Sequence, residues 1–241
     1  MERVPAINLH PVVTWLGVAL VTVHAVRHFL DQGSEEWALL TFAFIPARYG
    51  PEGTVLPGGE GALFWTPITY AFLHADWVHL FVNITWMAAF GGALARRFGA
   101  LRFIVLSLVS AVAGVALHFL LHHEDRSLVI GASAAVSGMV AATARFAFSP
   151  GGPLGGDRPE GAFRVPAEPL LSALRNGRAI AFILVWFGVN LVFGLVGGFA
   201  PGVSGPIAWE AHVGGFLAGL LCFPLLDPVS GKGLVSRPPA S

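Results

Sequence analysis

The sequence has few charged residues. Asp, Glu, Lys and Arg make up 12% of its 241 residues, against about 25% in an ordinary soluble domain. The 14 basic and 14 acidic residues give a formal net charge of zero, which excludes the broad basic surface that nucleic-acid binding needs. Hydrophobic residues account for 55% of the chain, and the mean hydropathy is +0.70. This composition predicts a membrane protein surrounded by lipids, with no nucleic acid as a partner.

Cysteine is nearly absent, since Cys222 is the only one. A single cysteine excludes an internal disulfide, and its apolar neighbours predict that it packs as a small hydrophobic side chain. The first apolar run lacks the small-residue cleavage site of a signal peptide and ends in His24, Arg27 and His28. We therefore expect this run to be retained as a membrane span.

Six apolar runs have about the length, roughly 20 residues, that crosses the hydrocarbon core of a bilayer. Unpaired backbone groups cannot face lipid, and the runs lack the alternating pattern of barrel strands, so helices are expected. The sequence predicts an all-α membrane protein, a bundle of six transmembrane helices. The expected spans lie near Val12–Leu30, Trp77–Ala95, Leu101–Leu121, Val129–Phe148, Ala179–Phe199 and Ile207–Leu226.

A single membrane domain is expected over residues 1–241, with the six-helix core at about 12–226. The Gly- and Pro-rich stretch at about 149–178 is typical of a flexible cytoplasmic linker, and 227–241 would form a short cytoplasmic tail. Trp65, Tyr70 and Trp77 are expected at the level of the outer headgroups, as interfacial aromatics are.

Basic residues divide unevenly between the two sides of this six-span topology. Only Arg27, Arg48 and Arg126 fall on the side of the acidic first loop. The other side holds Arg3, Arg96, Arg97, Arg102, Arg145, Arg158, Arg164, Arg175, Arg178, Lys232 and Arg237. The positive-inside rule then places both termini in the cytoplasm. Scarce lysine and the absence of a transit peptide favour a bacterial plasma membrane.

Polar residues recur near the starts of the second, fourth and sixth spans, which all run from outside to inside. Asp76 is expected to cap the second span, which places His79 on its first turn and Asn83 one turn later. Ser133 and His212 lie near the starts of the other two spans, within roughly 10 Å of the same boundary. These side chains are expected to share one polar cavity.

The chemistry that such a cavity permits is acyl transfer, because a serine beside a neutral imidazole provides a nucleophile and a general base. Ser133 at a helix N-terminus gains the positive end of the macrodipole and free N–H groups. His79 and Asn83 offer further donors to an oxyanion. Small residues on the two facing spans predict that Ser133 and His212 come within hydrogen-bond reach: Gly131, Ala134, Gly138, Ala142, Gly215 and Gly219.

Three segments resemble the signature motifs of the rhomboid family of intramembrane serine proteases. His74-Ala-Asp-Trp-Val-His79-Leu-Phe-Val-Asn83 resembles its H-x4-H-x3-N motif, and Gly131-Ala-Ser133 resembles its G-x-S motif. Ala211-His212-Val-Gly-Gly215-Phe-Leu-Ala-Gly219 resembles A-H-x-x-G-x-x-x-G. The resemblance covers Trp65–Leu226, essentially the whole predicted core.

The resemblance implies a serine protease in which Ser133 is the nucleophile and His212 is the general base. By the same comparison, His79, Asn83 and the backbone N–H of Ser133 form the oxyanion hole, and His74 has a structural role or lines the cavity. Substrates would be transmembrane segments of other proteins, and we expect small, helix-weakening residues near their outer boundary. The sequence does not predict an oligomeric state.

Three positions depart from the family pattern. The family usually has Gly directly after the nucleophile, where this chain has Ala134. It often has an aromatic platform for the imidazole four residues after the nucleophile, where this chain has Ser137. It often has an acidic residue in a G-x-x-E-x-R arrangement, where this chain has Ala95 before Arg97, and we expect a looser first loop as a result.

Other interpretations remain open at this stage. Ser137 is a rival nucleophile one turn deeper on nearly the same face. The pairs His24/His28 and His118/His122, the latter beside His123, have a spacing that can bind metal, but polar-tipped residues are commoner at such span ends, so we expect neither metal nor cofactor. The chain can also be interpreted as a pseudoprotease that binds transmembrane clients without cleavage. A transporter with a histidine relay is a third hypothesis.

Overall fold

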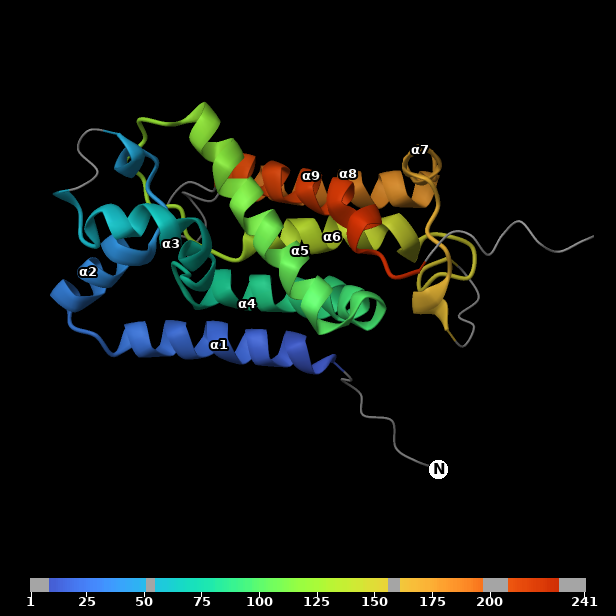
Figure 1. Cartoon of the computed structure of the whole chain (residues 1–241), viewed down its shortest axis with the longest axis horizontal. Coiled ribbons are helices and arrows are strands. Elements are labelled where there is room, and N and C mark those ends of the chain that lie inside the picture. Colours follow the sequence, from blue (N-terminus) through green and yellow to red (C-terminus); the bar gives the residue numbers. More distant parts are fainter. Residues whose placement is uncertain (1–8, 51–54, 156–160, 197–207, 230–241) are drawn as a thin grey trace, which may run out of the picture.

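The computed structural model describes residues 9–50, 55–155, 161–196 and 208–229. Within these ranges the chain folds into helices joined by loops, and Phe44 and Val129 form an isolated antiparallel bridge. The helices are α1 (Pro11–His28), α2 (Gln32–Phe42), α3 (Ala62–Thr69), α4 (Trp77–Trp86), α5 (Gly92–Leu121), α6 (Ser133–Ala147), α7 (Leu170–Ala173), α8 (Gly177–Val196) and α9 (Trp209–Leu226) (Figure 1). The predicted all-helical architecture is confirmed.

Helices α6 and α9 are in backbone contact at the centre of the molecule. A Cβ atom added to Gly215 would lie 2.1 Å from the carbonyl oxygen of Ala134, and one added to Gly219 would lie 2.1 Å from the carbonyl oxygen of Gly138. Ala134 precedes Gly138 in α6, and their partners Gly215 and Gly219 follow each other in the same order in α9, so the two helices run in the same direction. The small residues therefore permit the close approach that their spacing predicts.

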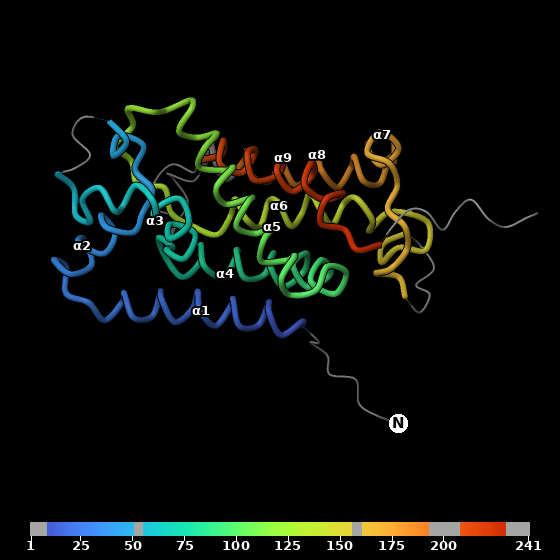
Figure 2. Tube along the Cα trace, in the orientation of Figure 1, coloured from blue at the N-terminus to red at the C-terminus, as the bar shows by residue number. Residues whose placement is uncertain are grey.

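Helix α5 runs in the opposite direction against both of these helices. A Cβ atom added to Gly114 would lie 2.5 Å from Cβ of Ala134 and 2.7 Å from the carbonyl oxygen of Ala211. Further along α6, Gly138 faces Ser110, which precedes Gly114 in α5. Helices α5, α6 and α9 thus form a core that is held together by glycine contacts, with α1, α4 and α8 around it (Figure 2).

Two helical stretches among the described residues are long and apolar enough to span a membrane. They are Trp77–Leu121 and Trp209–Leu226, and a shorter apolar stretch covers Gly177–Val192. The first comprises α4, a π-helical turn and α5, and it is broken at Gly99, whose φ of 75° and ψ of 171° are not helical. This break separates the second and third predicted spans. The count of six spans is not established by helix length and apolarity, and it stays a prediction.

Helix α6 begins four residues later than the sequence predicts. Residues 129–132 were expected to be helical, but Val129 instead pairs with Phe44, and the N–H of Gly131 donates to the carbonyl oxygen of Tyr70 at 3.0 Å. Gly131 has a φ of +119°, which interrupts any helix and which side chains with a Cβ atom rarely adopt. The apolar run therefore contains an extended entry followed by a helix that starts at Ser133.

The buried arginine Arg97 corrects the expectation about the first loop. Its guanidinium forms two hydrogen bonds of 2.8 Å with the carboxylate of Asp227, just after α9. It also donates to the carbonyl oxygens of Phe163 and Val165. Because Arg97 lies at the end of the bundle away from the first loop, Ala95 at the family's acidic position does not loosen that loop.

The first loop is instead anchored by arginines on its own side. Arg27 donates to the carbonyl oxygen of His74 at 2.8 Å and to Glu35 at 3.1 Å, so it joins the end of α1 to α2 and to the start of α4. Arg48, which is 1% exposed, donates to the carbonyl oxygens of Leu40 and Pro57.

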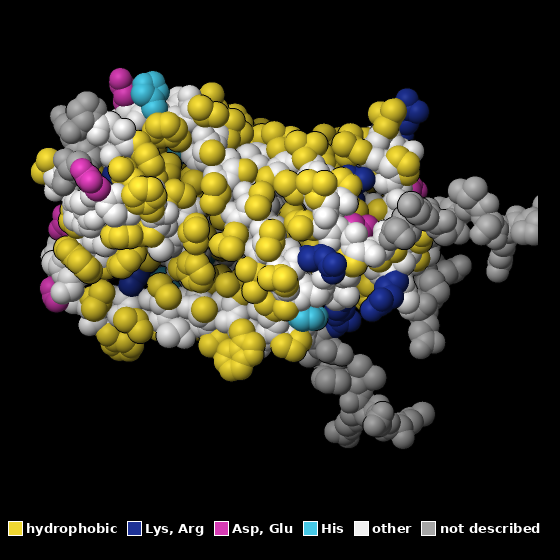
Figure 3. Space-filling view, viewed as in Figure 1, with side chains coloured by type: hydrophobic (Ala, Val, Ile, Leu, Met, Phe, Trp, Pro, Cys, Tyr) yellow, Lys and Arg dark blue, Asp and Glu magenta, His cyan; other side chains and the backbone are white. Residues whose placement is uncertain are grey.

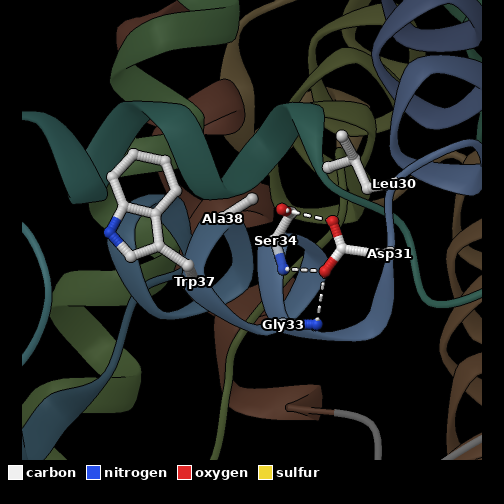
Figure 4. A pocket seen from close by; sticks show the side chains of 6 residues that line it. All are labelled: Leu30, Asp31, Gly33, Ser34, Trp37 and Ala38. Carbon is white, nitrogen blue, oxygen red and sulfur yellow. Dashed lines mark hydrogen bonds between the residues drawn. The ribbon is translucent and has the colours of Figure 1, made fainter.

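The start of α2 is fixed by its own cap in this loop. Asp31 accepts hydrogen bonds from the backbone N–H groups of Gly33 and Ser34, and the Ser34 hydroxyl donates to it at 2.6 Å (Figure 4). These hydrogen bonds lower the pKa of the Asp31 carboxyl below its ordinary value. The shallow pocket in Figure 4 is lined by this cap and by the exposed Trp37, and it contains none of the predicted site residues.

Charge is segregated along the long axis. On the face in Figure 3, most Lys and Arg side chains gather near the end where α9 terminates, most Asp and Glu lie toward the opposite end, and hydrophobic side chains cover the surface between. This is the division that the predicted topology requires. Arg3, Arg158, Lys232 and Arg237, most of the predicted tail and the loop between the fifth and sixth spans lie outside the described residues.

The predicted linker at 149–178 packs on the core in its described parts. Besides the two carbonyl groups bound by Arg97, Asn176 donates to the carbonyl oxygen of Phe148 at 3.2 Å. Helix α7 lies in the same segment, and its Ala173 is buried. These parts of the segment are therefore docked rather than detached.

Candidate active site

Ser133 is the first residue of α6 and is half-buried. As a first residue its N–H has no partner within the helix, so this donor is available to a bound group. Gly131, two residues before Ser133, lies beside the ring of His79. A Cβ atom at Gly131 would lie 2.7 Å from Cε1 and 2.8 Å from Nε2 of His79, and 3.8 Å from Oγ of Ser133.

His79 is oriented by the first turn of α4. Asp76 caps this helix as predicted, since its carboxylate accepts from the N–H of His79 at 2.8 Å. Nδ1 of His79 accepts from the backbone N–H of Ala75 at 3.5 Å. A neutral imidazole that accepts at Nδ1 carries its proton on Nε2. Nε2 of His79 lies beside Gly131, two residues before Ser133.

Asn83 lies one turn after His79 on α4 and is 4% exposed. Its side-chain NH₂ donates to the carbonyl oxygen of His79 at 3.0 Å. An amide NH₂ has two hydrogens, and this bond uses one of them, so one donor remains. The sequence-predicted pair His79 and Asn83 is therefore brought together on one helix face.

His74 is fully buried beside His79, with 5.1 Å between the two ring centroids. Its Nε2 accepts from the backbone N–H of Ala132 at 3.4 Å, and thus holds the residue that precedes Ser133. Burial, together with the neighbouring His79, lowers the pKa of His74 to about 3. The imidazole is then neutral near pH 7, which is the form that can accept this hydrogen bond.

His212 lies one turn before Gly215 on α9 and is 8% exposed. Because Gly215 contacts Ala134 and the helices are parallel, His212 lies at the level of residues 131–133. It is close enough to His79 for the two imidazoles to interact electrostatically. Its Nδ1 is buried without a hydrogen-bond partner, and within the described ranges no hydrogen bond joins His212 to Ser133. Nucleophile and base are often this loosely paired before substrate binds.

Two departures from the family pattern have local explanations. Ala134 is 1% exposed, and its methyl group occupies space that Gly114 leaves open on α5. Ser137 is fully buried, and its hydroxyl donates to the carbonyl oxygen of Ser133 at 2.8 Å. That bond is a common resting state for a serine in a helix, so the rival nucleophile has its hydroxyl hydrogen engaged.

Several contributors were missed or misplaced by sequence reasoning. Tyr70, expected at the headgroup level, is 1% exposed. Its hydroxyl donates to the carbonyl oxygen of Ala111, and its own carbonyl oxygen accepts from the N–H of Gly131. Glu210, two residues before His212, contacts His118 and His122. The G-x-S motif offers no signal for Tyr70, because its partners are distant along the chain.

The chain also matches known proteins over this core. A family model described as the Rhomboid domain matches residues 62–227. The chain belongs to the rhomboid family. The matched part of this rhomboid contains all three motifs, and its apolar helices make it an integral membrane protein.

Curated relatives of this rhomboid include proteins that are named as rhomboid proteases. Rhomboid-like protease 3 of Toxoplasma gondii is 27% identical over 136 residues, which are 56% of this chain and 48% of that protein. Rhomboid protease GlpG of Yersinia pestis (strain Pestoides F) is 29% identical over 159 residues, 65% of this chain and 46% of that protein. This rhomboid thus spans about half the length of the curated relatives it matches.

Proposed function

We propose that the protein is an intramembrane serine endopeptidase that cleaves transmembrane segments of other membrane proteins. The observation that carries the proposal is the contact of Gly215 with Ala134, because it brings the level of His212 to that of Ser133. Family membership and the protease names of the relatives support the same reaction class.

In the proposed reaction, Oγ of Ser133 attacks the carbonyl carbon of the scissile peptide bond while His212 accepts the hydroxyl proton. The carbonyl oxygen becomes an oxyanion. When the C–N bond breaks, the leaving amine takes the proton from His212, and an acyl group remains on Ser133. Water, activated by the same imidazole, then hydrolyses this ester and restores the serine.

The oxyanion would be stabilised by donors from two helices. Nε2 of His79 lies beside Gly131, Asn83 has a second amide hydrogen, and the N–H of Ser133 has no helical partner. Removing a single donor of this kind typically costs about 10²–10³ in kcat.

The proposed arrangement in the membrane has six spans, both termini in the cytoplasm and the site opening to the extracytoplasmic side of a bacterial plasma membrane. The segregation of basic and acidic side chains along the bundle supports this orientation. Ser133 and His212 both lie near the starts of helices on the acidic side, so water would enter from there.

A cleavage assay tests the proposal. The purified protein is reconstituted in vesicles with a transmembrane substrate that has small residues near its outer boundary, and wild type is compared with Ser133→Ala, His212→Ala and Ser137→Ala. We expect cleavage by wild type and Ser137→Ala, and its loss in the other two. Equal cleavage by all four proteins would rule out this dyad, and client binding without cleavage by folded wild type would favour the pseudoprotease.

A further inference from the structure

A second group of titratable side chains lies on the acidic side of the bundle, outside the proposed dyad. His118 and His122 are one turn apart at the end of α5, and Glu210 is in the first turn of α9. Nε2 of His122 lies 2.8 Å from one carboxylate oxygen of Glu210, and Nδ1 of His118 lies 3.4 Å from the other. One possible ligand atom from each residue lies within 4.8 Å of the other two.

This arrangement matches the chemistry of a transition-metal site. Zinc binds imidazole nitrogens and carboxylate oxygens at about 2.0–2.2 Å, so two ligands at the tetrahedral angle are about 3.4 Å apart. The ligand atoms of the cluster lie within 4.8 Å of one another, so side-chain rotations have to close the widest separation by up to about 1.4 Å. Two histidines at i and i+4 with a carboxylate from another helix provide three ligands, and water completes a tetrahedral shell.

The surroundings favour a cation and give it access. His118 and Glu210 are 5% and 7% exposed, whereas the side chain of His122 is 43% exposed and opens the cluster to solvent. The carboxylate of Asp125 is near enough to interact electrostatically with both imidazoles. The carboxylates of Glu210 and Asp125 thus supply negative charge that a divalent ion can neutralise.

We propose that His118, His122 and Glu210 form a binding site for a zinc-like divalent transition metal that cross-links α5 to the first turn of α9. The sequence led us to expect no metal here, because polar-tipped residues are common at the ends of spans, and only the fold brings Glu210 to the two histidines. The bound ion would restrain the turn that carries His212, which is two residues after Glu210. The site does not depend on the proposed proteolysis.

Zinc binding to the purified, metal-stripped protein in detergent tests this proposal. The stoichiometry is measured by elemental analysis after equilibrium dialysis, the affinity by competition with a chromogenic chelator, and the melting temperature with and without zinc. We expect one ion per chain and a rise in melting temperature of roughly 5 °C or more at zinc 100-fold above the Kd.

Three variants make the result specific. His122→Ala removes a partly exposed ligand, and Glu210→Gln keeps the shape of the side chain, so both should remain folded. Each should weaken zinc binding at least about tenfold and abolish the thermal shift. His123→Ala, which changes the exposed neighbouring histidine, should bind as wild type does. The proposal is wrong if wild type shows no saturable binding, if either ligand variant keeps wild-type affinity, or if His123→Ala loses as much.

Discussion

The carbonyl oxygen of Ala134 lies directly against the backbone of Gly215, where an added methyl group would be only 2.1 Å from it. This contact fixes the register of two parallel helices. Helix α6 begins at Ser133, one residue before Ala134, and α9 carries His212 one turn before Gly215. The same glycine therefore has a structural and a functional consequence. The proposed site depends on an approach that only a residue without a side chain allows.

Gly215→Ala should separate α6 from α9. Overpacking of this kind usually lowers the free energy of unfolding by about 1–3 kcal/mol, and cleavage should fall because the imidazole moves away from the serine. Thermal unfolding in detergent and the cleavage assay measure the two effects. Gly188→Ala in α8, where an added Cβ meets nothing within 4 Å, is the matched control and should change neither. Equal behaviour of both variants would contradict the packing argument.

Gly131→Ala should impair the proposed active site more than it impairs folding. The new methyl group would lie 2.7 Å from the ring of His79 at a φ of +119°, so the ring has to move. We expect at least about a tenfold drop in cleavage, which corresponds to about 1.4 kcal/mol in the transition state.

Gly161→Ala is the control that distinguishes backbone strain at a positive φ from a steric clash with His79. Gly161 also has a positive φ, of 90°, but an added Cβ there meets nothing within 4 Å. Gly161→Ala should lose a little stability, as Gly131→Ala does, but it should keep full activity. If Gly131→Ala cleaves as fast as Gly161→Ala, the contact with His79 has no part in the reaction.

Asp227→Asn should destabilise the cytoplasmic end that we propose for the bundle. It leaves the Arg97 guanidinium, whose side chain is fully buried, without its carboxylate, and breaking a buried pair in this way typically costs about 3–5 kcal/mol. The melting temperature in detergent measures the effect, and Glu36→Gln at an exposed position serves as the control. A melting temperature unchanged from wild type would mean that this ion pair does not hold the end of α9.

Stability should fall in acid because of His74. Its pKa is lowered by burial to about 3, whereas it returns to about 6.5 in the unfolded chain, so the unfolded state binds more protons below pH 6.5. The stabilisation is complete above about pH 6.5 and is lost progressively toward pH 3. His74→Gln should flatten this part of the pH profile of the melting temperature, and the exposed His123→Gln should leave it as in wild type. Identical profiles for all three proteins would contradict this assignment.

The sequence was sufficient where local rules govern the structure. The Asp76 cap and the glycine faces follow from capping preferences and short spacings, and the structure agrees with them. Long-range partners were a different matter. No local pattern links Arg97 to Asp227. The sequence therefore did not reveal that Arg97 lies at the end of the bundle away from the first loop, and a looser first loop was expected.

The surroundings of the candidate site show the same limit. Glu210 lies 88 residues from His122 in the sequence, and only the antiparallel packing of α5 on α9 brings them within 2.8 Å. Tyr70 was expected at the membrane interface, because the sequence does not show what the loop folds against, and in the structure it is buried. The late start of α6 was missed because an apolar run does not distinguish an extended entry from a helix.

Covalent labelling measures whether His212 activates Ser133, the step on which the proposed reaction depends. Folded protein is treated with a fluorophosphonate probe, and the adduct is located by mass spectrometry in wild type, Ser133→Ala, Ser137→Ala and His212→Ala. We expect an adduct on Ser133 in wild type and in Ser137→Ala, a strong loss of labelling in His212→Ala and no adduct in Ser133→Ala. An adduct on Ser137, or labelling of Ser133 that does not change when His212 is removed, would contradict the proposed dyad.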